Sequence, residues 1–268
     1  MVHVITQFYK VNYKNCDPNL IRKRQDEITK CFKINLAHKD VEKIHFLYEY
    51  QHDVDFLEEE GINKNHEKIV LYKLGKRMKY SLIFDYANKF LKDKICVYLH
   101  ADMCIDFGFD KLNNENLNNK IYALTPHNPI TCNKQFMCYC TKQFRTSKGY
   151  YGVSFDGFAF KSPINQKVIE DGDHYVGMMG SESRIICILK ENNYDVLCAD
   201  NVLHCNHLHH VKIFSQKRGK WINREGEHKE LNYYSDIHRR QKVLPWKDRI
   251  VGGGIPFFYG ACNIVKTL

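Results

Sequence analysis

The sequence predicts an α/β protein built on a mixed, mostly parallel sheet with helices on both faces. The first hundred residues read strand, helix, strand, strand, helix, strand, an alternation that is typical of parallel sheets. The run KICVYL (94–99) is short and continuously apolar, as expected of a parallel strand covered on both faces. Neither an internal repeat nor a low-complexity linker divides the 268 residues, so we expect one domain over 1–268.

The first elements follow from local patterns. Residues 2–8 alternate toward β structure. A helix is predicted from 18 to 36, because Asp17 can cap it, Pro18 suits its first position, and apolar residues recur at helical spacing. A second strand is predicted over 43–50.

The elements that follow complete the alternation. Residues 52–67 read as an acidic connection, and 68–72 as a third strand. The apolar residues of 80–91 fall on one face of an amphipathic helix, which leads into the fourth strand, 94–99.

The second half is less regular. The pattern predicts strands at 120–125, 153–160 and 194–199 and a helix at 181–193. The basic segment 211–268 reads either as a mobile flap, with the glycines 252–254 as a hinge, or as a static surface extension.

Composition bounds the class of protein. No secretory signal and no apolar run long enough to span a bilayer is visible, so we expect a cytoplasmic protein, in the host cytoplasm if the chain is viral. The eleven cysteines read as reduced thiols, and CNKQFMCYC (132–140) lacks the CxxC pair of a zinc site. The net charge of +9 fits either solvated faces or attraction of a polyanion, such as nucleic acid or a nucleotide diphosphate.

The fourth strand ends on polar residues, since KICVYL continues with His100, Asp102 and Asp106. Ligands of open α/β sheets bind outside the carboxyl ends of strands, so we expect this strand to deliver Asp102 to a cleft. Two ligands two residues apart on an extended segment can point at one ion, and this pair suits Mn²⁺ or Mg²⁺. Alternatively, Asp102 caps the next turn and His100 is a core histidine.

A histidine cluster lies in VLHCNHLHH (202–210). Its members are His204, His207, His209 and His210. Four histidines in nine residues indicate a metal ligand, a phosphate-binding pair, or both, although surface decoration is the alternative.

Two carboxylates also stand out. Asp156 interrupts the apolar strand VSFDGFAF, where a charge is costly unless it meets water, a metal or a substrate. Glu182 stands at the predicted start of a helix and could face a site from a rigid position. The alternatives are an edge-strand aspartate with a local partner and an ordinary first-turn acid favoured by the helix dipole.

The chain resembles a GT-A-fold glycosyltransferase, of a divergent type found in bacteria and large DNA viruses. The resemblance rests on seven short motifs in the family's order, within about residues 4–210. The motifs are TQFY (6–9), RKRQDE (22–27), GKRMKY (75–80), YLHAD (98–102), SFD (154–156), GSE (180–182) and HLH (207–209). One position departs from the family pattern, because His100 stands where the signature has Asp or Asn.

The resemblance implies a GT-A (Rossmann-like) fold. The implied activity is transfer of a hexose or deoxyhexose from a nucleotide-diphosphate donor, with UDP expected, to a glycan or other hydroxyl acceptor, assisted by Mn²⁺ or Mg²⁺. Asp156 and Glu182 are the implied catalytic residues. The implied metal ligands are Asp102, His207 and His209. The implied nucleotide-sugar-binding residues are Thr6, Gln7, Phe8, Tyr9, Arg77, Tyr80, His100, Ala101 and Asp102.

Three other classes compete with this interpretation. A metal-dependent phosphoesterase also uses Asp and His at strand ends, but we see no DxH or GDxxD run. A nucleic-acid-binding module explains the basic patches but not Asp102, Asp156 and Glu182, so we expect no nucleic-acid partner. A noncatalytic nucleotide-sugar-binding protein remains an open alternative. The sequence carries no signal for an oligomeric state.

Overall fold

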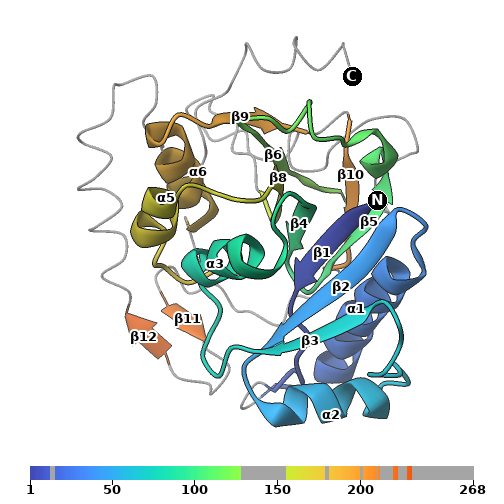
Figure 1. Ribbon diagram of the computed structural model, residues 1–268. Coiled ribbons are helices and arrows are strands. Elements are labelled where there is room, and N and C mark those ends of the chain that lie inside the picture. Colours follow the sequence, from blue (N-terminus) through green and yellow to red (C-terminus); the bar gives the residue numbers. More distant parts are fainter. Residues whose placement is uncertain are drawn as a thin grey trace.

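Seven strands form the central sheet of the computed structural model (Figure 1). They are β1 (Val2–Thr6), β2 (Val41–Tyr48), β3 (Ile69–Lys73), β4 (Ile95–Leu99), β6 (Lys120–Leu124), β8 (Gly157–Lys161) and β9 (Asp195–Cys198). Their order is β3-β2-β1-β4-β8-β6-β9, and only β8 runs against the other strands of this sheet. The structure describes residues 1–12, 16–127, 155–178, 181–199, 202–209, 211, 220–222 and 228–230. The predicted mixed, mostly parallel sheet is confirmed.

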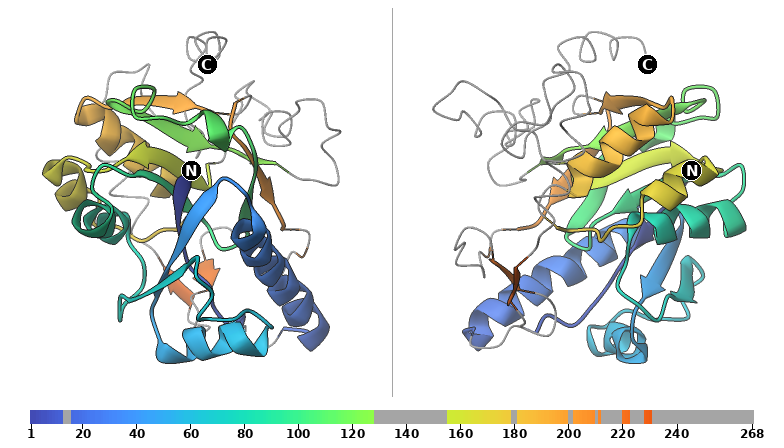
Figure 2. Two further views of the ribbon diagram at one scale, coloured as in Figure 1. Left: turned by 45° about the vertical axis from the view of Figure 1, so that its right-hand side comes forward. Right: turned by 90° about the vertical axis from the view of Figure 1, so that its left-hand side faces the viewer.

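Helices cover both faces of this sheet (Figure 2). They are α1 (Pro18–Ala37), α2 (Gln51–Glu59), α3 (Tyr80–Phe90), α5 (Gln166–Asp171) and α6 (Ser181–Glu191). Alternation along β1 separates two apolar layers, because Val4 packs with the residues of α1 and α2 while Ile5 packs with those of α3, α5 and α6. Each layer removes one face of the strands from water, which explains the apolar run of β4.

The start of α1 is as the sequence predicts. The Asp17 carboxylate accepts a hydrogen bond from the Asn19 backbone N–H at 2.9 Å, and Pro18 takes the first helical position. Ile28 and Phe32 are buried on the inner face of the helix. Arg24 and Glu27 share that buried face, which apolar periodicity does not account for.

The acidic connection predicted over 52–67 is wrong in its first part, because α2 occupies Gln51–Glu59. Val54 and Leu57 are buried at a spacing of one helical turn, so the segment has an apolar side despite its acidity. The Asp53 carboxylate accepts a hydrogen bond from the Tyr50 backbone N–H at 3.1 Å, which stabilises the start of the helix.

The segment that leads into β8 also differs from the prediction. The strand begins at Gly157, so Asp156 precedes it instead of interrupting it; residues 153 and 154 lie outside the described part. Because β8 is antiparallel to β4, Gly157 pairs with Leu99 and the start of β8 lies beside the end of β4. A Cβ atom on Gly157 would lie 2.6 Å from the Tyr98 carbonyl oxygen, so only glycine fits this crossing.

A small second sheet was not predicted. It consists of β5 (Met103–Phe107), β10 (His204–His207) and β7 (Pro126–His127), in the order β5-β10-β7. β10 runs antiparallel to β5, and His207 pairs with Met103. The histidine-rich segment therefore reaches the residue that follows Asp102.

The remaining described elements are short. They are the 3₁₀ helix η1 (Phe109–Lys111) and the antiparallel pair β11 (Lys220–Ile222) and β12 (His228–Glu230). Most of the predicted basic flap, 211–268, and all of the cysteine segment, 132–140, lie outside the described residues. Among the helices that are described, none combines the length and the apolar character that crossing a membrane requires.

Candidate functional site

The candidate site lies where β1 and β4 end and β8 begins. The Thr6 hydroxyl donates a hydrogen bond to the Leu99 carbonyl oxygen at 3.0 Å, which joins the ends of β1 and β4. The His100 N–H bonds to the Asp156 carbonyl oxygen at 3.0 Å, and the Asp156 N–H bonds to the Leu124 carbonyl oxygen at 3.1 Å. Carboxyl ends of parallel strands thus meet at one edge, the usual place for ligands in α/β sheets.

A tight turn separates His100 from Asp102. The Met103 N–H donates to the His100 carbonyl oxygen at 3.0 Å, which closes a four-residue turn. The expectation that both side chains point at one ion from an extended segment is therefore wrong: they contact different neighbours.

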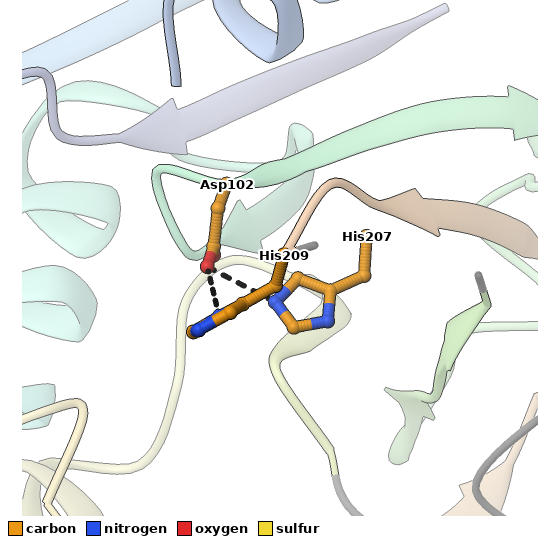
Figure 3. Close-up of side chains that lie close together, drawn as sticks. All are labelled: Asp102, His207 and His209. Carbon is orange, nitrogen blue, oxygen red and sulfur yellow. Dashed lines mark hydrogen bonds and ion pairs between the residues drawn. The ribbon is translucent and has the colours of Figure 1, made fainter. Parts of the chain in front are cut away.

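Asp102 contacts two histidines of the β10 segment (Figure 3). Its Oδ2 atom lies 3.0 Å from His207 Nε2 and 3.3 Å from His209 Nδ1. Arg24, on α1, donates a third hydrogen bond to the same oxygen. Burial by itself raises the pKa of Asp102, but the charges of His207 and Arg24 outweigh it and hold this pKa well below its ordinary value. Asp102 is therefore an anion at neutral pH.

The three residues of Figure 3 can hold a divalent ion. One ligand atom from each of Asp102, His207 and His209 lies within 4.8 Å of the others. One carboxylate and two imidazoles suit Mn²⁺ or a similar transition ion better than Mg²⁺, which prefers oxygen ligands throughout. The hydrogen bond from Arg24 is the kind of outer support that ligating carboxylates have. The donor set therefore fits a metal.

A second cluster forms around His100. Its Nδ1 atom lies 4.0 Å from Asp156 Oδ1, and its Nε2 atom lies 3.7 Å from Glu182 Oε1. The Ser181 hydroxyl donates to Glu182 Oε1 at 2.8 Å, at the start of α6. Burial raises the pKa of Glu182, and Asp156 raises it further, while His100 acts in the opposite direction. Two carboxylates far apart in the sequence thus share one imidazole.

The predicted nucleotide-binding segment 6–9 contributes mainly to packing and to the strand ends. Phe8 is fully buried and packs on Phe32 and Phe56, and Gln7 and Tyr9 are partly exposed. Their roles toward a nucleotide stay predictions.

Arg77, Tyr80 and Ala101 occupy three different surroundings. The Arg77 guanidinium lies 5.0 Å from the centre of the Tyr175 ring and bonds to the sulfur of Met178. Tyr80 is fully buried beneath the His100 cluster, and the Glu182 and Asp156 charges, after burial itself, raise its pKa. Ala101 lies half-buried in the turn.

A third histidine of 202–210, His204, does not join the Asp102 cluster. His204 stands at the far end of β10, where its Nδ1 atom lies 2.9 Å from Asp106 Oδ2. His210 lies outside the described residues.

Arg24 and Glu27 are the site residues that sequence reasoning missed. The motif RKRQDE marks them only as part of a resemblance. The sequence does contain a signal for them, because Arg24 and Glu27 fall on the helix face that also carries Ile28 and Phe32. Charged residues are rarely buried unless they are paired, so a charge on an apolar stripe indicates a partner across the interface.

The cleft expected beside Asp102 stays a prediction. A surface hollow of about 440 Å³ lies along α1, with Lys30, Lys33 and Glu60 among its lining residues. Neither Asp102 nor Glu182 lines it.

No family model matches the sequence, and no curated protein matches it. Among solved structures, HddC from Yersinia pseudotuberculosis complexed with GMP-PN is 13% identical over 65% of this chain and 81% of its own, with a TM-score of 0.40. The 4-diphosphocytidyl-2C-methyl-D-erythritol synthase from Anaerococcus prevotii is 12% identical (74% and 86%; TM-score 0.40). The apo-form glycosyltransferase GlyE in Streptococcus pneumoniae is 16% identical (74% and 45%; TM-score 0.40). These likenesses are too distant to carry an argument about function.

Proposed function

We propose that the protein is a metal-assisted glycosyltransferase that moves a sugar from a nucleotide diphosphate, with UDP expected, to a hydroxyl of a glycan or similar acceptor. One observation carries the proposal. After the single turn that follows β4, Asp102 contacts His207 and His209. His100, in the same turn, lies beside Asp156 and Glu182. The reaction needs a metal site that can bind the diphosphate next to carboxylates that can act on the sugar and the acceptor, and these two clusters can supply both.

The first cluster suits the leaving group. Negative charge develops on the diphosphate oxygens as the bond to the sugar breaks, and cations placed there stabilise the transition state. Asp102, His207 and His209 are the residues that would hold a divalent ion, which supplies positive charge to the phosphates when bound.

The second cluster suits the sugar and the acceptor. The reacting carbon gains oxocarbenium character, which a nearby carboxylate stabilises. A carboxylate can also accept the proton of the acceptor hydroxyl, and a raised pKa makes it a better base near neutral pH. Glu182 has this property, so we assign it and Asp156 to the transfer step.

The remaining assignments belong to the same proposal. The segment 6–9 and Arg77 are assigned to the nucleotide, and the chain is treated as one domain over 1–268. For the basic segment 211–268, most of which lies outside the described residues, a flap over the donor and a static surface extension both stay open.

A thermal-shift screen tests the proposal. UDP, GDP and CDP and their sugars are added with and without Mn²⁺, because a ligand that binds only the native state raises the melting temperature. We expect UDP or a UDP-sugar to raise it, and more so with Mn²⁺. No response to any nucleotide would overturn the proposal. Hydrolysis of simple phosphate esters without sugar transfer would favour a metal-dependent phosphoesterase.

A further inference from the structure

Arg24 and Glu27 form a buried ion pair on the inner face of α1. The Arg24 Nη1 atom lies 2.8 Å from Glu27 Oε2, and the two side chains are only 7% and 10% exposed. Taking two charges out of water is costly unless further hydrogen bonds satisfy them. Further hydrogen bonds to Arg24 and Glu27 are therefore expected.

The pair contacts both chain segments of the candidate metal site. Arg24 donates through Nη2 to Asp102 Oδ2 and through Nη1 to the Leu208 carbonyl oxygen at 2.9 Å. Leu208 lies between the two candidate histidine ligands. Glu27 Oε1 accepts a hydrogen bond from the Val211 N–H at 3.1 Å. One helix therefore makes hydrogen bonds both to the turn that carries Asp102 and to the segment at the end of β10 that carries the histidines.

We infer that Arg24 and Glu27 are positioning residues that hold Asp102 and the segment 207–209 in the arrangement that binds a divalent ion. The inference deepens the proposed function and rests on it for the identity of the site as a metal site. Neither residue touches the ion or the substrate in this assignment. Both act through the three residues of Figure 3.

A cation beside a metal site also repels the metal, so the charges must be weighed. Glu27 lies within hydrogen-bond distance of the Arg24 guanidinium and offsets its charge. Together with Asp102 the three groups carry a net charge of −1, from one cation and two carboxylates. The pair can therefore orient Asp102 without adding net positive charge that would repel the metal. Because the two charges offset each other, Arg24 and Glu27 should be replaced together.

The test compares two charge-balanced double variants, each of which removes an arginine of α1 together with its carboxylate partner. In Arg24→Gln/Glu27→Gln we expect Mn²⁺ affinity, measured by electron paramagnetic resonance of the free ion, to fall roughly 10–100-fold. The matched control is Arg22→Gln/Glu60→Gln, which removes the pair of Arg22 Nη1 and Glu60 Oε1, 2.6 Å apart. The control should bind Mn²⁺ like the native protein, even if its melting temperature falls.

Wild-type affinity in Arg24→Gln/Glu27→Gln, or an equal loss in the control, would overturn the inference. If the site double variant does not fold, Arg24→Lys decides. It keeps the charge but loses the fork that bridges Asp102 and Leu208, so we expect weaker Mn²⁺ binding at a near-native melting temperature. Unchanged binding in this variant would overturn the inference.

The two proposals can fail separately. A native protein that binds no Mn²⁺ overturns the inference, whereas UDP-sugar transfer without metal would remove only the metal from the proposed function and leave the sugar transfer standing. Mn²⁺ binding that depends on Arg24, without a response to any nucleotide, would support the inference and overturn the proposed function.

Discussion

Asp102 and Glu182 lie at one edge of the sheet with side chains only 11% and 18% exposed, yet their pKa values move in opposite directions. Burial raises the pKa of each. Asp102 faces Arg24 and two histidines, and its pKa falls well below the ordinary value. Glu182 has one nearby imidazole and a second carboxylate, and its pKa rises. Burial is the main reason that the pKa of Glu182 rises, whereas at Asp102 the charges of His207 and Arg24 outweigh burial and keep the carboxylate charged.

The largest expected effect falls on the cluster around His100. We expect Glu182→Gln and Asp156→Asn each to lower turnover by about 100-fold or more, the scale of lost acid–base catalysis. Donor affinity should change little, because the diphosphate is assigned to the other cluster. Steady-state kinetics with a responsive UDP-sugar measures both quantities.

The control for this pair is Glu191→Gln, an exposed carboxylate at the end of the same helix as Glu182. It should transfer sugar at the native rate. Near-normal turnover in both Glu182→Gln and Asp156→Asn would remove the transfer step from this cluster.

The complementary change is Asp102→Asn. Losing the carboxylate ligand should weaken Mn²⁺-dependent nucleotide binding by about 100-fold. Isothermal calorimetry of UDP with and without Mn²⁺ gives the affinity directly. If Asp102→Asn binds normally while Glu182→Gln does not, the two clusters have been assigned the wrong way round.

A third buried group contributes to the acid sensitivity of the fold, and its effect must be known before the two clusters can be titrated. His45 Nε2 lies 3.0 Å from His3 Nδ1, and His45 Nδ1 lies 2.9 Å from the Tyr86 hydroxyl. Burial, with His3 and Lys43 adding to it, lowers the pKa of His45 to about 3. Below the ordinary histidine pKa, His45 is therefore protonated in the unfolded chain but stays neutral in the native state.

It follows that stability is lost as the pH falls below about 6.5 and that the loss continues down to about 3. We expect the free energy of unfolding to be about 2 kcal/mol lower at pH 5 than at pH 7 from this group. Urea unfolding at the two pH values measures it. In His45→Gln the difference should shrink, and an unchanged difference would assign the acid sensitivity to other groups.

The smallest expected effect is a shift of a pH profile. His100 lowers the pKa of Glu182, so in His100→Gln this pKa should rise further. If Glu182 accepts the acceptor's proton, the acid limb of the pH–rate profile then moves to higher pH. A limb that stays in place, measured where the fold is stable, would contradict the role given to Glu182.

The central sheet could be predicted from the sequence because its signals are local. Apolar runs and helical spacing identified the strands β1 to β4 and the helices α1 and α3, and Asp17 with Pro18 marked where α1 begins. The same local logic placed polar residues after β4 and marked Glu182 at a helix start. Side-chain period and capping chemistry act over a few residues, so a single chain displays them.

Only the tertiary structure decided how the polar residues divide into two clusters. No local sequence signal predicts the hydrogen bond from the Met103 N–H to the His100 carbonyl oxygen. The turn that this bond closes directs the side chains of His100 and Asp102 to different neighbours. The partners of Asp102 come from α1 and from the segment after β10, each more than seventy residues away. Contacts of that range depend on packing and strand register, which periodicity does not encode. The antiparallel course of β8, which brings Asp156 to His100, was settled in the same way.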